Sequence, residues 1–519
     1  MIENKTRNKF NCTRIELIIQ IGLILGIILF VAMMIYINLF HYTAILNADS
    51  ASEAVLARLI WDTKDIRPDS WYASTEQRVI GAPNWAALIY GITGNAKIAM
   101  GMSCSLMLLS ILLGLSFLSS EIQVSGRMKL GIIFLALALP LSMDALQLIY
   151  LFASYYGIHV LALFIITGYY AKVRKEKAGY FKACMIQAVL AFLLGMQGFR
   201  GILILFIPLA VIATMIFAYG LLQKTKINKN DIFLLIWSYF LLLCSYLGTR
   251  LPGSVPQSVS RNIRNGFSKF WQVVVPDLLS ILGFSNATFI VKLCLLVLCI
   301  GAIGNVLFLL LKIIKRKDIV PYEWFILFLW CSLLVSLLAV AFTTIESSNR
   351  YGFMAIFILV FSAALIIHKA HNVIKYIYVL AIFVLSIHNI SENYLPLLAT
   401  EEPPQTEAYA VVQYMEEQGY KNGYATFENA NVMTVLSEDV RVVAVASVDK
   451  MEICKWLSSS EWYVPNVPYE QDTIYIITET EMEQFKLFKT EHEDTLLELA
   501  RIGKYHLFLS PYNYSNLGK

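Results

Sequence analysis

Residues 17–40 read LIIQIGLILGIILFVAMMIYINLF, a run without one acidic or basic side chain. A helix of about 20 apolar residues crosses the ~30 Å hydrocarbon core of a bilayer. The run is too long for the core of a signal peptide and no small-residue cleavage site follows it, so we expect an uncleaved first span. Similar runs recur and predict a mainly α-helical, polytopic membrane domain with about eleven spans. The expected spans are residues 17–40, 96–118, 128–142, 145–171, 182–198, 201–222, 231–248, 288–311, 322–342, 351–367 and 375–394.

The composition of the whole chain also indicates a membrane protein. Of its 519 residues, 58% are hydrophobic and 15% are charged, and the mean hydropathy is +0.62, whereas a soluble domain has about 25% charged residues. The net charge is only +4 and the sequence has no concentrated basic face, so no nucleic-acid partner is expected. The eight cysteines show neither CxxC spacing nor metal-site spacing with histidine, so we expect them to be packing residues.

Lysine and arginine cluster in alternate loops, and such loops face the cytoplasm. The basic segments are the N-terminus and residues 127–129, 172–182, 224–229, 312–317 and 369–375. This pattern predicts a multi-pass protein of the plasma membrane with a cytoplasmic N-terminus. Two long loops, 41–95 and 249–287, then face outward. We therefore expect a transmembrane domain over residues 1–395 and an extracytoplasmic domain over residues 396–519.

The C-terminal tail opens with a charged, helix-breaking linker at residues 401–404. Beyond the linker, helical and alternating patterns follow one another, which predicts a small α/β domain. Its ~120 residues are enough for a core of its own. The expected helices are 406–418 and 429–436, and the expected strands are 423–427, 440–446, 473–478 and 506–510.

Several familiar motifs are missing from the sequence. It contains no P-loop, no GxGxxG after a strand, no HExxH and no GxSxG. The expected spans carry no charge near mid-depth, and His159 and Gln187 are their main deep polar residues. A buried charge usually marks the path of a transported ion, so an ion-coupled transporter is disfavoured.

The first outer loop, 41–95, carries the most informative pattern. Asp49 directly precedes a helical stripe of Ala51, Val55 and Leu59, and Glu53 lies four residues after Asp49 on the same face. The stripe predicts a helix lying along the membrane interface. Two roles stay open for Asp49 on composition alone, because aspartate is also a common N-cap of a helix.

An aspartate just beyond the first span, followed by a short acidic and alanine-rich helix, resembles the GT-C superfamily. These are membrane glycosyltransferases that use polyprenyl-phosphate-linked sugars. The residues that match its loose first-loop pattern are Asp49, Glu53, Ala54, Ala57 and Arg58. Asn349-Arg350-Tyr351 stands where later outer loops of the superfamily carry an Arg-Tyr leading into a span. The stretches 69–76 and 423–427 resemble those of an uncharacterised bacterial branch.

The resemblance implies an inverting transfer of a sugar from a polyprenyl-phosphate donor to an extracytoplasmic glycan, lipid or protein acceptor. Such a transfer needs a base for the acceptor hydroxyl and positive charge for the departing phosphate. The implied catalytic residues are Asp49, as the base, and Glu53. Arginines at outer helix ends run against the positive-inside tendency and suit phosphate. The implied substrate- and phosphate-binding residues are Arg350, Tyr351, Arg200, Arg250, Arg58 and Glu76.

Two questions stay open at this point. Ser50 stands where many members of the superfamily have a second acidic residue, so the metal ligands are unknown and a requirement for Mg²⁺ or Mn²⁺ is undecided. Two other classes of protein also remain. A lipid-sugar flippase or other transporter would need a polar channel between the helices. A non-catalytic membrane protein that binds glycans would lack an intact carboxylate site at the outer face.

Overall fold

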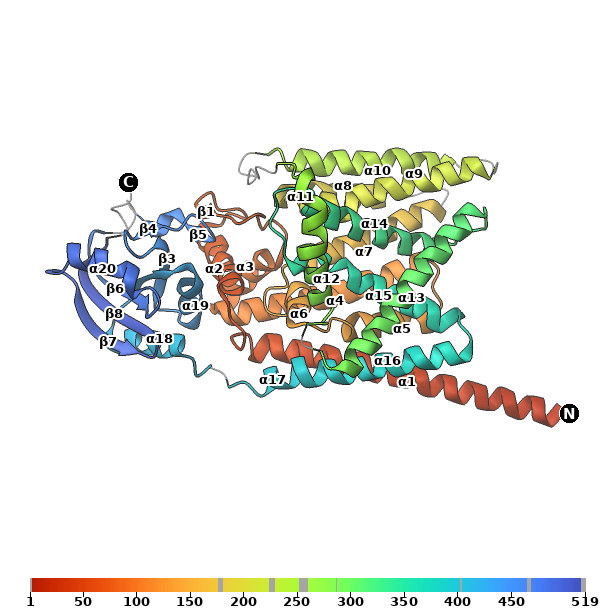
Figure 1. Cartoon of the computed structure of the whole chain (residues 1–519), viewed down its shortest axis with the longest axis horizontal. Helices are drawn as coiled ribbons and strands as arrows, with labels where there is room; N and C mark the ends of the chain where they lie inside the picture. Colours follow the sequence, from red (N-terminus) through yellow and green to blue (C-terminus); the bar gives the residue numbers. More distant parts are fainter. Residues whose placement is uncertain are drawn as a thin grey trace.

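The computed structural model describes residues 2–175, 181–223, 229–251, 260–285, 287–401, 404–463 and 468–514, with side chains described from residue 17 onward. A bundle of long helices carries a mixed α/β domain at one end, and the N-terminus lies at the other end (Figure 1). The connection between residues 314 and 321 and that between residues 369 and 372 lie at the N-terminal end of the bundle (Figure 1). The first long loop lies between the bundle and the α/β domain.

The bundle consists of helices that run roughly along its length (Figure 1). They are α1 (Ile2–Phe40), α4 (Ala96–Glu121), α5 (Gly126–Ala138), α6 (Met143–Ile149), α7 (Gly157–Lys175), α8 (Phe181–Gln197), η1 (Ile202–Phe206) with α9 (Ile207–Leu222), α10 (Lys229–Gly248), α13 (Phe289–Ile314), α14 (Pro321–Ala341), η3 (Asn349–Gly352), α15 (Met354–Lys369), α16 (Asn372–Asn389), η4 (Ile390–Tyr394) and α17 (Leu395–Leu398). Among the described residues, eight helices are long and apolar enough to cross a membrane, or nine if α5 and α6 form one bent span. This confirms a multi-pass membrane fold but not the predicted number of about eleven spans.

The difference arises at three predicted spans. Residues 128–142 and 145–171 form the bent pair α5–α6 and then α7, and residues 182–198 form α8, a shorter apolar helix of 17 residues. The chain bends by 117° between α5 and α6 and turns again before α7. Helix α5 ends shortly before Pro140, because proline cannot continue a helix. Phe152 and Ser154 have φ of 56° and 45°, which also stops a helix. The buried amide of Asn38 donates to Tyr150 O at 3.1 Å and accepts from Phe152 N at 2.9 Å, which satisfies the broken backbone inside an apolar bundle.

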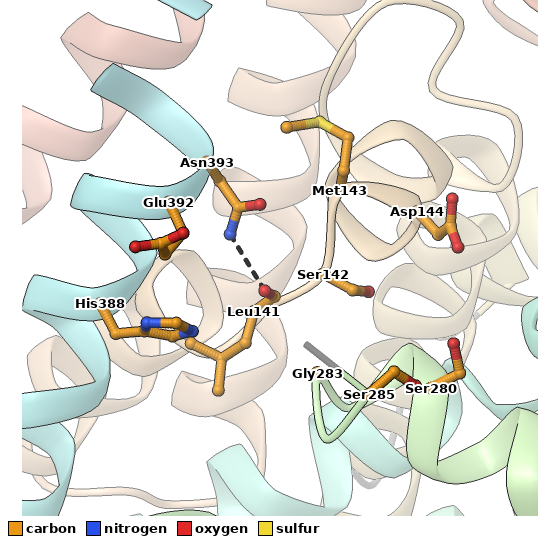
Figure 2. A pocket seen from close by; sticks show the side chains of 10 residues that line it. All are labelled: Leu141, Ser142, Met143, Asp144, Ser280, Gly283, Ser285, His388, Glu392 and Asn393. Atoms are coloured by element: carbon orange, nitrogen blue, oxygen red, sulfur yellow. Dashed lines mark hydrogen bonds between the residues drawn. The ribbon is translucent and has the colours of Figure 1, made fainter. Parts of the chain in front are cut away.

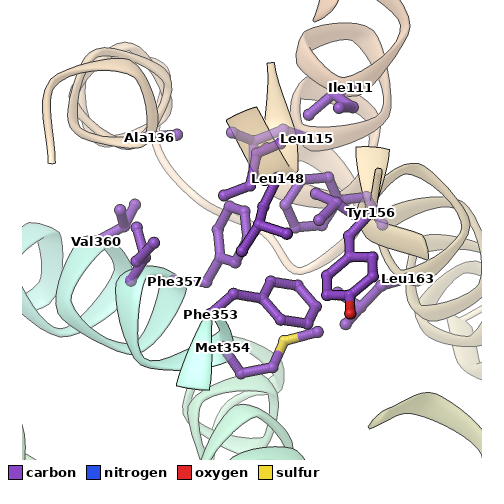
Figure 3. Close-up of a cluster of buried hydrophobic side chains, with 14 of the residues drawn as sticks. Ile111, Leu115, Ala136, Leu148, Tyr156, Leu163, Phe353, Met354, Phe357 and Val360 are labelled. Carbon is purple, nitrogen blue, oxygen red and sulfur yellow. The ribbon is translucent and has the colours of Figure 1, made fainter. Parts of the chain in front are cut away.

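Close helix contacts hold the bundle together. A Cβ added at Gly195 in α8 would lie 2.0 Å from the carbonyl oxygen of Ser245 in α10, so only glycine permits this approach. A single large apolar cluster fills the bundle. Phe353, which precedes α15, and Phe357 of α15 lie near Tyr156 and Leu148 in this cluster (Figure 3).

The two long loops contain short elements at the end of the bundle that carries the α/β domain. They are α2 (Ala48–Thr63), β1 (Trp71–Tyr72) and α3 (Ala82–Thr93) in the first loop, and α11 (Ile263–Lys269), η2 (Phe270–Val274) and α12 (Val275–Ile281) in the second. Helix α2 packs against α3, α4 and α19 of the α/β domain, and most of its residues are buried. Its apolar stripe therefore faces protein, which corrects the prediction of a helix lying along the membrane interface.

The C-terminal domain has a six-stranded mixed sheet with the order β4-β3-β2-β6-β8-β7. Its elements are α18 (Glu407–Gln418), β2 (Asn422–Thr426), α19 (Phe427–Leu436), β3 (Arg441–Ser447), β4 (Glu452–Ile453), β5 (Ser458–Ser459), η5 (Ser460–Trp462), β6 (Glu470–Thr478), α20 (Met482–Glu491), β7 (Leu497–Ile502) and β8 (Tyr505–Tyr512). Strand β2 pairs in parallel with β3 and β6, and the other pairs are antiparallel. Helices α18 and α19 cover one face of the sheet, and α20 covers the other. The predicted α/β character is confirmed.

The α/β domain is joined to the first loop by backbone as well as side-chain contacts. Strand β1 pairs antiparallel with β5, so that Trp71 is opposite Ser459. The ring of Trp71 meets the ring of Trp462 edge to face, with centroids 6.1 Å apart. This pairing brings a segment of the C-terminal domain over the end of the bundle, next to the site described below.

Candidate functional site

A cavity of about 590 Å³ opens where the first loop, the end of α14 and the C-terminal domain meet. Cavities of this size are typical of small-molecule sites. It is lined by Asp49, Glu53, Ser74, Thr75, Arg78, Tyr155, Arg200, Thr344, Ile345, Glu346, Ser347, Ser348, Arg350, Tyr351, Trp456 and Leu457. The charged residues come from α2, from the loop after β1, from the turn before η1, from the loop between α14 and η3, which carries Glu346, and from η3.

The structure tests the helix-capping role that the sequence left open for Asp49. Asn47 is the N-cap of α2, because its side chain accepts from Ser50 N at 2.8 Å while Ser50 Oγ accepts from Asn47 N at 3.0 Å. This reciprocal capping box satisfies the helix terminus without Asp49. The capping alternative is therefore wrong, and the carboxylate of Asp49 is left to face the cavity.

Asp49 lies opposite Arg350, which η3 holds at the start of α15. Arg350 Nη2 is 3.8 Å from Asp49 Oδ2, and both side chains are almost half exposed, at 46% and 43%. Arg350 Nε also donates to Ser348 Oγ at 3.1 Å. An ion pair this long and this open leaves donors of the guanidinium and lone pairs of the carboxylate free for a ligand.

Behind Asp49 lies a buried chain of four charges, Glu53–Arg78–Glu76–Arg200. Arg78 Nη2 is 2.7 Å from Glu53 Oε1, and its Nε donates to both oxygens of Glu53. Arg78 Nη1 donates to Glu76 Oε2 at 3.1 Å, and Arg200 Nε donates to Glu76 Oε1. The negative charges of two carboxylates thus balance the positive charges of two guanidiniums in a region shielded from water. Such a chain holds its members rigidly, because the loss of any member would leave a buried charge unpaired.

The two buried carboxyls differ in their electrostatics. Burial raises the pKa of Glu53, although Arg78 opposes the shift, and the charge of Asp49 adds to it. Burial would raise the pKa of Glu76 as well, but Arg200 and Arg78 outweigh it and lower that pKa to about 2. Glu76 is therefore a permanent anion between two arginines.

The loop that carries Glu76 and Arg78 is clamped to the end of α8. Gln197 O accepts from Gln77 N at 3.0 Å, and Gln197 Oε1 accepts from Val79 N and Ile80 N. Gly198 then turns the chain with φ of 140°, a conformation that side chains other than glycine rarely adopt. The turn directs Arg200 back toward Glu76.

Arg200 is also held by aromatic rings. Its guanidinium lies 4.0 Å from the ring centre of Tyr156 and 4.9 Å from that of Tyr351. Stacking of this kind favours arginine over lysine. Arg200 therefore fixes the position of Tyr351 and of Glu76 at one wall of the cavity, while Arg350 remains the more available cation.

Most of the residues suggested by the sequence meet at this cavity. Asp49, Glu53, Arg200, Arg350 and Tyr351 line it, and Glu76 lies behind its wall in the ion-pair chain. Two suggested residues lie elsewhere. Arg58 pairs with Glu438 of the C-terminal domain and lines a different cavity, and Arg250 stacks on Tyr246 at the end of α10 without lining the site.

Most of the other lining residues were not anticipated, and three of them matter most for the site. Arg78 lies two residues after Glu76, and only the fold shows that it bridges Glu53 and Glu76. The hydroxyl of Tyr155 is buried and has no hydrogen-bond partner among the described residues. Trp456 comes from the C-terminal domain and reaches the cavity through the β1–β5 pairing. The Glu-x-Arg spacing of Glu76 and Arg78 in the first loop was the one available signal, and it is weak.

Two smaller cavities adjoin the site. Asp49 and Asp144 both line a cavity of about 130 Å³, and Asp144 also lines a cavity of about 320 Å³. In the latter, His388 and Glu392 lie on the opposite side from Asp144, and Asn393 donates to Leu141 O at 3.0 Å (Figure 2). The polar space therefore continues beyond Asp49.

The side chains around Asp49 do not form a complete metal site. Among the described residues, no group of three or more histidine, cysteine, aspartate or glutamate side chains is placed to hold an ion. Asp49 and Asp144 could offer oxygen atoms to Mg²⁺ or Mn²⁺. However, Arg350 faces Asp49, and Asn349 donates to Asp144.

Comparison with known proteins supports a fold rather than a family. No protein-family model matches the chain, and no curated protein matches it. ArnT from Cupriavidus metallidurans in the apo state is similar with a TM-score of 0.56 and 10% identity, over 96% of this chain and 98% of that one. ArnT bound to undecaprenyl phosphate gives a TM-score of 0.51 and 9% identity, over 94% and 98%. The Archaeoglobus fulgidus oligosaccharyltransferase in complex with zinc and sulfate gives 0.51 and 11%, over 89% and 70%.

Both of these proteins are polytopic GT-C glycosyltransferases. The likeness extends over nearly the whole chain, including the C-terminal domain. The chain therefore has a GT-C-like fold, as the resemblance in its sequence implied.

Proposed function

From this GT-C-like fold and the cavity at its loop-bearing end, we propose that the chain is an inverting membrane glycosyltransferase. It takes a sugar from a polyprenyl-phosphate donor and transfers it to an extracytoplasmic acceptor. The observation that carries the proposal is the pairing of Asp49 with Arg350. A carboxylate that is not a helix cap and a partly free guanidinium face one cavity.

Arg350 is the residue best suited to hold the donor phosphate. The other two arginines of the cavity are engaged, Arg78 by Glu53 and Glu76, and Arg200 by Glu76 and two tyrosine rings. Arg350 makes the long contact to Asp49, one bond to Ser348 and a contact with the hydroxyl of Tyr156, and no short ion pair within the described part of the chain. Its planar fork suits two phosphate oxygens at once. The complex of ArnT with undecaprenyl phosphate supports a polyprenyl phosphate as the donor carrier.

The chemistry follows from the placement of these two side chains. Asp49 takes the proton of the acceptor hydroxyl while the oxygen of that hydroxyl attacks C1 of the sugar. The bond from C1 to the acceptor oxygen forms while the bond from C1 to the phosphate oxygen breaks. The electron pair of the broken bond stays with polyprenyl phosphate, whose growing negative charge Arg350 stabilises. Attack from the face opposite the phosphate inverts the configuration at C1.

The surroundings of Asp49 keep the two groups in place. The ion-pair chain from Glu53 to Arg200 forms the rigid wall behind them and fixes α2 against the loop after β1. Both carboxylate oxygens of Glu53 accept hydrogen bonds from Arg78, so Glu53 positions the site and adds negative charge near Asp49. Asp49 itself acts as the base. Trp456 and Leu457 place the C-terminal domain at the entrance, where it shapes access of the acceptor.

The substitution Asp49→Asn tests the proposal. It removes the base but keeps the size of the side chain, and the helix cap at Asn47 is untouched. We expect transfer from a polyprenyl-phosphate sugar in membranes to fall by roughly 10²-fold or more, with donor binding and thermal stability nearly unchanged.

Asn47→Ala is the matched control for this experiment. It removes the cap of the same helix, which costs about 1 kcal/mol of stability, and it leaves the base in place. Turnover per folded molecule should therefore persist in Asn47→Ala. Retained turnover in Asp49→Asn would remove the chemical basis of the glycosyltransferase proposal.

A further inference from the structure

A second large cavity lies on the far side of α2 from the catalytic one and has no part in the proposed reaction. It measures about 490 Å³ and lies between α2, α19 and β3 and the short helix η5. It is lined by Val55, Arg58, Leu59, Asp62, Thr63, Thr434, Arg441, Glu461 and Trp462. The first loop and the C-terminal domain each supply about half of the wall.

Two guanidiniums with unused donors converge on this cavity. Arg441 has no carboxylate within ion-pair distance among the described residues; it lies over the ring of Trp462, 5.9 Å from its centre. The Nε atom of Arg58 is buried and has no hydrogen-bond partner in the described part of the chain. Its ion pairs with Glu438 and Asp62 are long, at 3.7 and 4.0 Å.

The proximity of the two cations is unfavourable without a ligand. Partial burial and then the repulsive charge of Arg58 lower the pKa of Arg441, while the carboxylate of Asp62 opposes this shift. An oxyanion between the two guanidiniums would offset this repulsion. Its oxygen atoms would accept hydrogen bonds from the unused N–H groups of both arginines. The pair of arginines therefore points to a carboxylate or a phosphate.

The remaining lining fits a sugar ring. Trp462 is held in place by its edge-to-face contact with Trp71 and offers an aromatic face. Asp62 and Glu461 are exposed carboxylates, and carboxylates accept hydrogen bonds from hydroxyl groups. An aromatic face with a few converging polar groups is the usual composition of a small-molecule site.

We infer that this cavity binds an acidic saccharide, with its ring against Trp462 and its carboxylate or phosphate between Arg58 and Arg441. Its position gives the ligand a role that rests on the proposed glycosyl transfer. Arg58 lies nine residues after Asp49 on α2, about 13 Å along the helix. Residues 456–462 run from the catalytic cavity to this one. The cavity would therefore hold a remote, anionic part of the acceptor glycan.

Three disaccharides that differ only at C6 of the terminal ring test the inference. Cellobiouronic acid carries a carboxylate there, cellobiose a hydroxymethyl group, and cellobiose 6′-phosphate a phosphate. Binding to the full-length protein in detergent would be measured by calorimetry at low and high salt. We expect at least one charged disaccharide to bind roughly tenfold more tightly than cellobiose, because a charged hydrogen bond is strong, and we expect salt to weaken it.

Substitutions locate the binding. Arg441→Ala should abolish the preference for the charged disaccharide, and Arg441→Lys should keep part of it. Arg501→Ala is the matched control, since Arg501 lies on β7 of the same domain and pairs with Glu479 away from the cavity. If Arg441→Ala fails to fold, as judged by its melting curve, Trp462→Leu replaces it and should weaken all three ligands.

The carboxylate and phosphate arms show which oxyanion is preferred. Equal binding of the neutral and charged disaccharides, absence of binding of both charged ones at about 10 mM, or an unchanged preference in Arg441→Ala would overturn the inference. The measurement contains no transfer step. If the protein binds the charged disaccharide but has no transferase activity, the missing activity refutes the proposed function, while the binding still supports this site.

Discussion

At the scale of the residue, Arg350 is the cation that the proposed reaction needs most. Arg350→Lys keeps the charge but loses the planar fork, so we expect donor turnover to fall roughly tenfold or more. Thermal stability should stay near that of the wild type, because the side chain is almost half exposed. Sugar transfer in membranes and a melting curve measure the two effects.

Arg250→Lys is the matched control for Arg350→Lys, because Arg250 lies at a helix end without lining the cavity. Its transfer rate should equal that of the wild type. Full activity of both Arg350→Lys and Arg350→Ala would place the donor phosphate at another residue.

Glu76 connects the site to stability. Its pKa is lowered from 4.5 to about 2 in the folded protein, so its contribution is complete above about pH 4.5 and is lost as the pH falls toward 2. Glu76→Gln leaves Arg200 without its carboxylate and should cost about 3 kcal/mol. Melting temperatures between pH 6 and pH 2.5 should therefore fall more steeply for the wild type than for Glu76→Gln. Parallel curves would show that Glu76 does not carry this linkage.

The residue scale also shows what the sequence can predict. Asp49 and Arg350 are 301 positions apart, yet the resemblance suggested both and the fold brings them within 3.8 Å. The preference of aspartate for N-cap positions gave the wrong cap for α2. Asp49 was a possible N-cap by composition, whereas Asn47 is the N-cap and forms a capping box with Ser50. Arg78 has no motif of its own, and its role arises only from two carboxylates that the fold places around it.

At the scale of the element, the C-terminal domain is expected to fold on its own. Its sheet has separate apolar clusters on both faces, one under α18 and α19 and one under α20. A fragment of residues 404–514 should therefore melt cooperatively and should show no transferase activity. Ile474→Asp in the same fragment is the control, since Ile474 is fully buried and a charge there should abolish the transition. A fragment that is disordered, or that transfers sugar, would contradict this expectation.

Periodicity predicted the elements that are strongly patterned and missed those that are not. The helix at 407–418 and the strands at 422–426 and 441–447 were expected within two residues. Helix α20 and strand β7 were missed, because α20 is largely charged and β7 has mostly exposed or half-buried side chains. The break between α6 and α7 was missed because an apolar composition continues through it, and the Asn38 side chain that stabilises it lies on another helix.

At the scale of the whole molecule, composition was sufficient for a polytopic helical fold, and first-loop residues were sufficient for the GT-C-like resemblance. The arrangement of the end of the bundle was not predictable, since Trp456 and Trp462 reach their cavities through a pairing of two-residue strands. Such short strands carry no periodic signal. The positive-inside pattern of the loops predicts that this end faces outward, on the side where the proposed acceptor lies.

The most direct test of the proposed transfer is a structure of the protein with a bound polyprenyl-phosphate sugar, determined in the Asp49→Asn variant to prevent turnover. We expect the phosphate within hydrogen-bond distance of Arg350 in the 590 Å³ cavity, and the sugar C1 facing residue 49. The polyprenyl chain should leave this cavity toward the surface of the bundle. A phosphate bound away from Arg350, or a lipid-linked sugar lying between the helices at mid-depth, would contradict the proposed mechanism and favour a transporter.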